Sequence, residues 1–138
     1  MPERTSFEYA AIRVVPRVDR EEFVNAGVIV FCLARHFLEA RVEVNESRLR
    51  AVWPEIDLDA VGRHLRAIPA VCQGQGPIGA LTRRERFHWL ISPRSTVIQT
   101  SPAHAGLCET PLQALEELFE RLVSATATAR LNKNTSIW

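Results

Sequence analysis

The sequence predicts an α+β fold in which a small antiparallel β-sheet packs against helices. Three observations lead to this prediction. The first third of the chain holds three short segments with strand character, joined by turns short enough for an antiparallel meander. Later segments carry apolar residues at helical spacing. One further segment, residues 95–101, is rich in β-branched residues and lies between two prolines, so it adds a later strand to the sheet.

The first two expected strands are apolar. Residues 7–15 (FEYAAIRVV) are rich in β-branched and aromatic types and end at Pro16. Residues 23–33 (FVNAGVIVFCL) form the most apolar run, and from position 26 onward both faces are apolar, as in a strand covered on both sides. Gly27 within this run indicates a bulge or the close approach of another backbone.

The third expected strand, residues 37–44 (FLEARVEV), alternates between apolar and charged residues. Leu38, Ala40, Val42 and Val44 share one face, while Glu39, Arg41 and Glu43 share the other. This pattern predicts a strand with one buried face and one face in water.

The middle of the chain predicts helices. Residues 46–53 form a short helix that Pro54 stops, and Asp57 caps a second helix that Pro69 ends. The second helix has an apolar stripe at helical spacing, made of Leu58, Val61, Leu65 and Ile68. Residues 73–79 (QGQGPIG) read as a loop, because their glycine spacing matches neither phosphate-binding motif.

Two capping-box patterns predict the remaining helices. Thr82 with Glu85 opens a helix over residues 83–91 that buries Phe87, Leu90 and Ile91. Thr110 with Gln113, and a proline at the first helical position, open the last helix. Its expected core stripe is Leu112, Leu115, Leu118, Phe119 and Leu122. We expect one α+β domain over residues 1–124 and a polar tail over 125–138, whose final Trp138 has no assigned role.

Composition excludes several classes of protein. The net charge of +1 argues against a bulk electrostatic grip on nucleic acid. No run approaches the roughly 20 apolar residues of a membrane span, and the first residues lack the layout of a secretory signal. Cys32, Cys72 and Cys108 are odd in number and widely spaced, which favours a reducing cytoplasm over a disulfide framework.

The stretch SPRSTVIQTSPAHAGLCE (92–109) is the most polar candidate site. In a regular strand Arg94 and Gln99 fall on opposite faces, so they share no site unless a bulge intervenes. The structural interpretation is a strand whose hydroxyl groups bond to neighbours. The functional interpretation is a rim that binds an anionic ligand or partner, together with His104 on the following loop.

Basic residues cluster just before this stretch, at Arg83, Arg84, Arg86, His88 and Arg94. Arg83 and Arg84 occupy the first turn of a helix, where positive charge is unfavourable against the helix dipole. A solvent-exposed face paired with Glu85 explains the cluster structurally. A surface that holds phosphate or an acidic protein explains it functionally.

His104 and Cys108 have the spacing of a thiol and its base, although no third, orienting group is evident. As zinc ligands they would need two more, and only His64 and Cys72 are available, so we expect no metal and no cofactor. Asn25, beside Gly27, is predicted to bond to the backbone rather than to act in catalysis.

Three segments resemble a bacterial family, the domain of unknown function 3037. The family's motifs are Y-x-x-I-R-x-V-P, E-F-x-N-x-G-V-x-x-F and P-R-S-T-x-I-Q-x-S-x-x-H-x-G. They fall on Tyr9, Ile12, Arg13 and Pro16, on Glu22, Phe23, Asn25, Gly27, Val28 and Phe31, and on Pro93, Arg94, Ser95, Thr96, Ile98, Gln99, Ser101, His104 and Gly106. The family has no established activity, so the resemblance implies no catalytic residue. Genes of the family often lie beside genes for HipA-like serine/threonine kinases, so the resemblance implies such a protein partner.

We therefore expect a non-catalytic binding or regulatory module that contacts a protein partner or a second copy of itself. Its candidate contact residues are Arg83, Arg86, Arg94, Gln99, His104 and Asn25. The alternative is a small hydrolase or transferase acting on a phosphorylated or nucleotide-like substrate, with Arg86 and Arg94 on the anion and His104 or Cys108 in the chemistry. Binding of nucleic acid through the arginines is a third, less favoured hypothesis.

Overall fold

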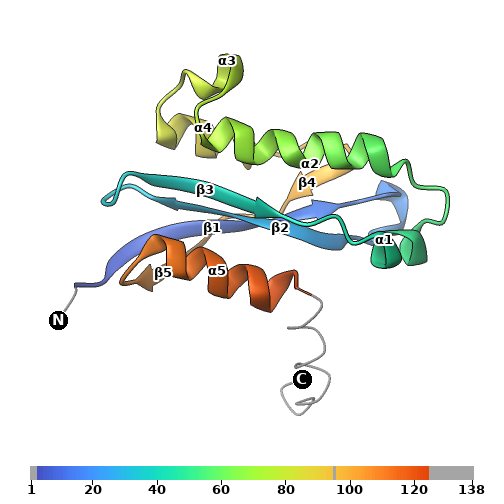
Figure 1. The fold of residues 1–138 in the computed structure, drawn as a ribbon, viewed down its shortest axis with the longest axis horizontal. Coiled ribbons are helices and arrows are strands. Elements are labelled where there is room, and N and C mark those ends of the chain that lie inside the picture. Colours follow the sequence, from blue (N-terminus) through green and yellow to red (C-terminus); the bar gives the residue numbers. More distant parts are fainter. Residues whose placement is uncertain (1–2, 95, 125–138) are drawn as a thin grey trace, which may run out of the picture.

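A computed structural model of the chain describes residues 3–94 and 96–124. It confirms the α+β class: a five-stranded antiparallel sheet lies between helices on both faces (Figure 1). The strands are β1 (Thr5–Val14), β2 (Val24–Cys32), β3 (Phe37–Val42), β4 (Ile98–Thr100) and β5 (His104–Cys108). The order is β3-β2-β1-β4, and β5 also pairs with β1, so β1 is the central strand.

The helices divide between the two faces of the sheet. They are α1 (Glu46–Val52), α2 (Leu58–Cys72), α3 (Gly76–Gly79), α4 (Arg83–Leu90) and α5 (Pro111–Leu122), with a 3-10 turn at Val18–Arg20. Helices α2 and α4 cover one face, here called the α2 face, and α5 covers the other, the α5 face (Figure 1). Within the described ranges, no helix combines the length and apolarity needed to cross a membrane.

Strands β1 and β2 supply both hydrophobic cores, because successive side chains point to opposite faces. Ile12 and Ile29 are fully buried on the α2 face. Phe7, Val28 and Val30 are buried on the α5 face. Each such side chain contributes about 1.5–3 kcal/mol through burial, and the expected covering of the second strand on both sides is confirmed.

Strand β2 contains a β-bulge, and Gly27 lies beside it. Ile12 pairs with Gly27 but Arg13 pairs with Asn25, so Ala26 is an extra residue in β2. A Cβ atom on Gly27 would lie 2.6 Å from the backbone oxygen of Arg41 in β3. Both features that the glycine indicated, a bulge and a close backbone approach, are therefore present.

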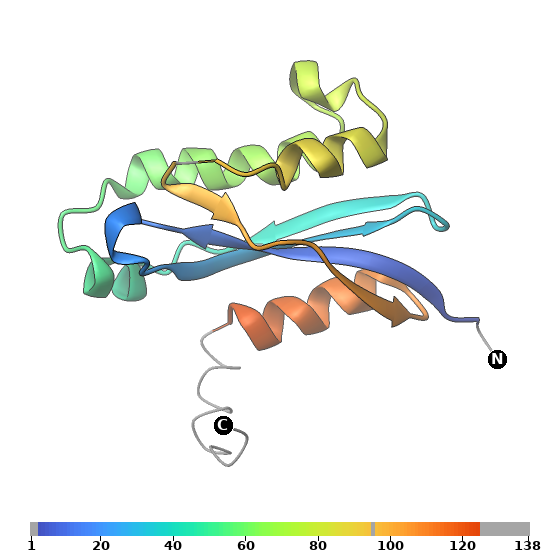
Figure 2. The same cartoon turned by 180° about the vertical axis from the view of Figure 1, so that it is seen from behind.

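The strand β5 was not predicted, and the expectation that His104 lies on a loop is wrong. Strand β4 pairs with residues 12–14 of β1, and β5 pairs with residues 5–9, so the two strands follow one another along the same edge (Figure 2). Pro102 and a glycine gave this segment little strand character, but pairing with the free edge of β1 satisfies its backbone.

Ser101 joins β4 to β5 across the centre of β1. Its backbone N–H donates to the Ala11 oxygen at 2.9 Å, and the Ala11 N–H donates to the Ser101 hydroxyl oxygen at 2.9 Å. The hydroxyl in turn donates to the Pro102 oxygen at 3.0 Å. The Ser101 hydroxyl thus accepts the Ala11 N–H that a backbone carbonyl oxygen would accept in a regular ladder.

Helix α2 runs past Pro69 to Cys72, so the predicted end of this helix is wrong. Proline removes one helical hydrogen bond, but the last turn still closes because the Gln73 N–H donates to the Pro69 oxygen at 3.1 Å. Val71 and Cys72 also pack into the α2-face core, which favours the extra turn. The predicted loop at 73–79 contains the short helix α3.

The capping box at Thr82 is confirmed, whereas the one at Thr110 is not formed. The Glu85 N–H donates to the Thr82 hydroxyl at 3.2 Å, and the Thr82 N–H donates to the Glu85 carboxylate at 3.0 Å. The Thr110 hydroxyl instead contacts the Gln113 side-chain oxygen. In α5 the predicted Leu112 is 46% exposed and Ala114 is buried in its place, because Pro111 starts the buried stripe one residue earlier.

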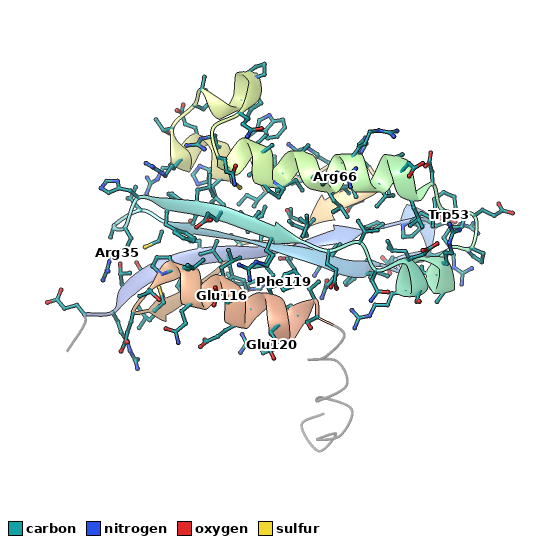
Figure 3. All side chains as sticks on the ribbon, in the orientation of Figure 1. Arg35, Trp53, Arg66, Glu116, Phe119 and Glu120 are labelled. Carbon is teal, nitrogen blue, oxygen red and sulfur yellow. The ribbon has the colours of Figure 1, made fainter. Side chains whose placement is uncertain are left out.

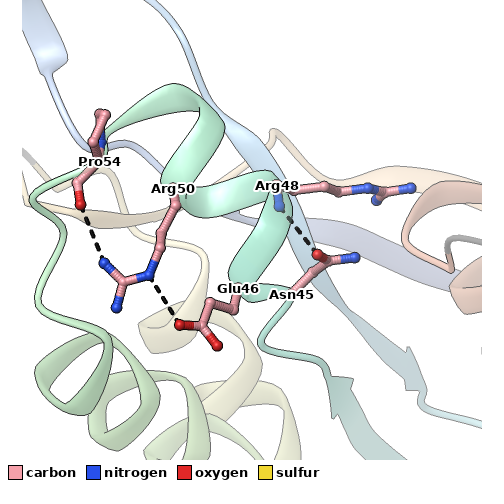
Figure 4. Close-up of polar contacts among 5 residues, drawn as sticks. All are labelled: Asn45, Glu46, Arg48, Arg50 and Pro54. Carbon is pink, nitrogen blue, oxygen red and sulfur yellow. Dashed lines mark hydrogen bonds and ion pairs between the residues drawn. The ribbon is translucent and has the colours of Figure 1, made fainter.

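Helix α1 is held by its own polar side chains (Figure 4). The Asn45 side-chain oxygen accepts the backbone N–H of Arg48 at 3.1 Å and caps the helix. Arg50 donates to the Glu46 carboxylate at 2.9 Å and to the Pro54 oxygen at 3.1 Å. The side chain of Arg48 also donates to the Val123 oxygen at 2.8 Å, which ties α1 to the end of α5.

The face of β3 predicted to lie in water is partly covered by α5. Arg41 in β3 contacts the Glu116 carboxylate at 4.0 Å, and its guanidinium lies 5.8 Å from the centre of the Phe119 ring. Figure 3 shows both partners on α5. These contacts remain solvent-exposed, so they add little to stability.

The polar tail predicted for residues 125–138, with Trp138, lies outside the described residues, as does Ser95. The single-domain boundary at residue 124 stays a prediction.

We expect Gly27→Ala to lower the free energy of unfolding by about 1–3 kcal/mol, because the new methyl group would overlap the β3 backbone. Gly62→Ala is the matched control: the methyl group there would meet only the flexible end of Arg66, and alanine favours a helix, so stability should hold or rise by up to about 1 kcal/mol. Urea denaturation measures both. Equal effects at the two glycines would contradict the close approach.

Candidate functional site

A cavity of about 250 Å³ opens on the α5 face where four elements meet. We call it the Arg13 pocket. Its lining residues are Tyr9, Ala11, Arg13, Phe23, Asn25, Ser101, His104 and Leu122. They come from the middle of β1, the start of β2, the junction of β4 with β5, and the end of α5.

The β-bulge brings Asn25 into this pocket. Without the extra residue Asn25 would face away from Val28, but the bulge returns it to the α5 face opposite Arg13. Facing residues of an antiparallel pair have Cβ atoms about 4.5–5.5 Å apart. The Asn25 amide nitrogen donates to the Leu122 oxygen at 3.2 Å, which confirms the predicted bond to the backbone.

The Asn25 side-chain oxygen is buried and has no hydrogen-bond partner among the described residues. The Leu122 oxygen can only accept, so the amide nitrogen must face it, and the amide oxygen points away from that bond. A buried acceptor without a partner is unfavourable by about 1–3 kcal/mol.

Arg13 is the second group in the pocket with unmet bonding capacity. Its Nε atom is buried and has no partner in the described part of the chain. Its guanidinium lies 4.2 Å from the centre of the Phe23 ring, a cation–π contact that holds the group in place. None of the described lining residues is acidic, so no carboxylate in the pocket balances this charge.

The Tyr9 and His104 rings and the Ser101 hydroxyl also line the pocket. His104 pairs with Tyr9 across β5 and β1, and the two rings lie 5.4 Å apart, centre to centre. The Ser101 hydroxyl is already bonded to the backbone on both sides. Arg13 is the only arginine or lysine among the described lining residues, so it selects for an anion.

The structure brings together two of the predicted contact residues, Asn25 and His104, and places Arg94 elsewhere. Arg94 borders a second, mostly apolar cavity of about 280 Å³ between α2, α4 and β4. Its guanidinium donates to the Leu90 and Trp89 oxygens at 3.0 and 2.7 Å and lies 4.5 Å from the Trp89 ring centre. It thus caps the end of α4.

Gln99 also borders the second cavity, so the expectation that Arg94 and Gln99 are kept apart by strand alternation is wrong. The reason is that β4 covers only Ile98–Thr100, and alternation does not extend back to residue 94. Gln99 donates to the Thr96 oxygen at 2.9 Å, within its own segment.

The predicted basic cluster separates into exposed and buried members. Arg83 and Arg84 are exposed and border a cavity near the turn between β2 and β3. Arg86 is only 9% exposed. It donates to the Val71, Cys72 and Leu81 backbone oxygens at 3.0, 2.6 and 3.0 Å. A cation at this position satisfies carbonyl groups at the C-terminal end of α2 and complements its dipole.

His104 and Cys108 do not form a nucleophile and base in this structure. Both lie on β5, and four residues of strand separate them by about 13 Å. Burial raises the pKa of the Cys108 thiol, and burial raises that of Cys72 to about 12, so both thiols stay protonated at neutral pH. In the described part of the chain, no three histidine, cysteine or acidic side chains gather as metal ligands.

In the sequence, only the family motifs single out Arg13 and Phe23, and the motifs assign them no chemical role. A signal for Arg13 was present: it is the one charged residue on a strand face that otherwise carries Phe7, Tyr9 and Ala11. A cation on a largely apolar face calls for a partner. The position of Phe23 depends on how β2 enters the sheet, which the sequence does not show.

One comparison with known proteins found a match. The model of a family described as a protein of unknown function (DUF3037) matches residues 9–123. All the residues that line the Arg13 pocket fall within this range. No curated protein and no solved structure matches the chain.

We expect Arg86→Met to lower the free energy of unfolding by about 3 kcal/mol or more, because three backbone oxygens lose a charged donor. Arg84→Met, on the exposed side of the same helix, should change it by no more than about 0.5 kcal/mol. Chemical denaturation measures both. A small effect at Arg86 would contradict its structural role.

Cys72 should make the protein less stable at alkaline pH. Burial raises its folded-state pKa from 9.0 to about 12. Between these values the unfolded thiol loses its proton while the folded thiol keeps it, so the free energy of unfolding should fall as pH rises from 9 toward 12. The Cys72→Ala variant should show a smaller fall in denaturation curves across this range. Parallel pH profiles would contradict the assignment.

Proposed function

The chain belongs to the DUF3037 family of proteins of unknown function. We propose that it is a non-catalytic binding module that holds a protein partner. The observation that carries the proposal is the Arg13 pocket, where, among the described residues, the guanidinium has no carboxylate partner and the Asn25 amide oxygen has no hydrogen-bond partner. An anionic group of the partner would enter this pocket and bond to Arg13. Charge-assisted hydrogen bonds of this kind are about twice as strong as neutral ones.

The surroundings of the pocket also suit a protein interface. Phe23 is 45% exposed although it is a large aromatic residue, and its ring supports the arginine. Aromatic residues and arginine are the commonest energetic centres of protein interfaces. The contact face is therefore the α5 side of the sheet around Arg13, Asn25 and His104, rather than the basic helix α4.

The partner that the family resemblance indicates is a HipA-like kinase encoded beside the gene. An acidic or phosphorylated group on that kinase would complement Arg13. The three unpaired cysteines suit a cytoplasmic complex.

The enzyme hypothesis finds less support from the geometry. Its two anion-binding arginines are occupied, since Arg86 serves the end of α2 and Arg94 the end of α4. The Arg13 pocket, at about 250 Å³, is also below the roughly 300–1,000 Å³ of pockets that enclose drug-sized ligands. A single side chain or chain end fits it better than a nucleotide does.

We expect Arg13→Gln to weaken binding of the adjacently encoded kinase by at least about ten-fold, the usual loss for a charged hydrogen bond. Arg84→Gln is the matched control, because it removes one positive charge from α4 on the other face, and it should leave the affinity unchanged within about two-fold. Calorimetric titration of purified kinase into each variant measures the affinities.

Two results would contradict the proposal. If the wild-type chain does not bind the kinase at micromolar concentration, the partner is wrong. If Arg84→Gln weakens binding as much as Arg13→Gln does, the contact is general electrostatics or lies on α4. Thermal unfolding of each variant checks that the fold is intact.

A further inference from the structure

Two buried polar atoms of residues that line the Arg13 pocket, one donor and one acceptor, have no hydrogen-bond partner among the described residues. The donor is Nε of Arg13 and the acceptor is Oδ1 of Asn25. The two residues face each other across β1 and β2, so both groups can reach one small ligand. A ligand that satisfies both groups needs a hydrogen-bond donor in addition to a negative charge.

Neither atom has a hydrogen-bond partner among the described residues. The Ser101 hydroxyl already donates to the Pro102 oxygen, so it is not available to Asn25. The amide of Asn25 cannot be turned over, because its nitrogen would then leave the Leu122 oxygen, which lies 3.2 Å away. A ligand that offers both an acceptor to Arg13 and a donor to Asn25 would satisfy both atoms.

The need for a donor separates classes of anion. Acetate carries acceptors only, so it would bond to Arg13 and leave the Asn25 oxygen buried and unpartnered. A carboxylate whose neighbouring carbon carries an amide N–H offers both groups a few ångströms apart. This arrangement is the end of every peptide chain.

Building on the binding function proposed above, we propose that the Arg13 pocket recognises an N-acylated α-amino carboxylate, the group at the C-terminus of a peptide. The carboxylate bonds to Arg13, and the N–H of the last residue donates to Asn25. The Tyr9 and His104 rings, 5.4 Å apart, and the Phe23 ring offer apolar surface to the last side chain.

The donor requirement can be tested on the wild-type protein with small probes. N-acetyl-leucine has both groups, 4-methylpentanoate has the same carbon skeleton and carboxylate without the N–H, and N-acetyl-leucinamide keeps the N–H but lacks the charge. We expect calorimetry to show N-acetyl-leucine binding at least about ten-fold more tightly than either analogue. Acetate, which also lacks a donor, should bind as weakly as 4-methylpentanoate.

Substitutions then test whether N-acetyl-leucine binds in the Arg13 pocket. Arg13→Gln should abolish binding of N-acetyl-leucine, whereas Arg84→Gln should leave it unchanged. Arg13→Lys keeps the charge but loses the Nε donor, so it should bind at least about five-fold more weakly than the wild type. An N-acetylated tetrapeptide ending in leucine distinguishes the source: tighter binding than N-acetyl-leucine favours a peptide end, and equal binding favours a free acylated amino acid.

The possible failures are distinguishable. If 4-methylpentanoate or acetate binds as tightly as N-acetyl-leucine, the pocket recognises negative charge without the donor, and this inference is overturned while the binding function stands. If no probe binds, the inference is likewise overturned, and the kinase titration with Arg13→Gln decides the binding function separately. If Arg13→Gln still binds N-acetyl-leucine, the ligand lies outside the Arg13 pocket and this inference is overturned, whereas the kinase titration still decides the binding function.

Discussion

Arg13 and Asn25 share a face of the sheet because β2 carries one extra residue at Ala26. Side chains in a strand alternate strictly, so a single inserted residue reverses the direction of every side chain that precedes it. The reversal puts Asn25 on the α5 face opposite Arg13, where its amide nitrogen donates to the Leu122 oxygen. Gly27 allows this bulge, because only a residue without a side chain fits so close to β3. The geometry of the pocket follows from that one local irregularity.

The other wall of the pocket depends on how β1 uses its second edge. That edge is shared by two short strands, and the Ser101 hydroxyl bonds to Ala11 at the junction between them. Because Pro102 cannot donate a hydrogen bond, the chain leaves the ladder there and rejoins it at His104. The break opens space above Ala11, and the end of α5 closes it from the other side. The Arg13 pocket thus lies at a break in the pairing along this edge of β1.

Arg86 and Arg13 place their positive charges in two different environments. Arg86 is buried, yet backbone oxygens at the end of α2 and beside α4 surround it, so its charge serves the fold. Arg13 is half-buried and is supported by an aromatic ring, but its Nε atom has no acceptor among the described residues. Burial of a donor is tolerated when the fold supplies the acceptor. Where the fold does not, a ligand is the natural source.

Local sequence determined the α+β class, the meander and most helix positions, because alternation, helical spacing and capping residues such as Thr82 act over a few neighbouring positions. It also indicated the irregularity at Gly27 and the backbone bond of Asn25. Only the tertiary structure decided the strand β5, the burial of Arg86 and the meeting of Arg13 with Asn25. Those features depend on hydrogen bonding and register between segments far apart in the chain, and no local pattern of side chains encodes which edge a backbone will join.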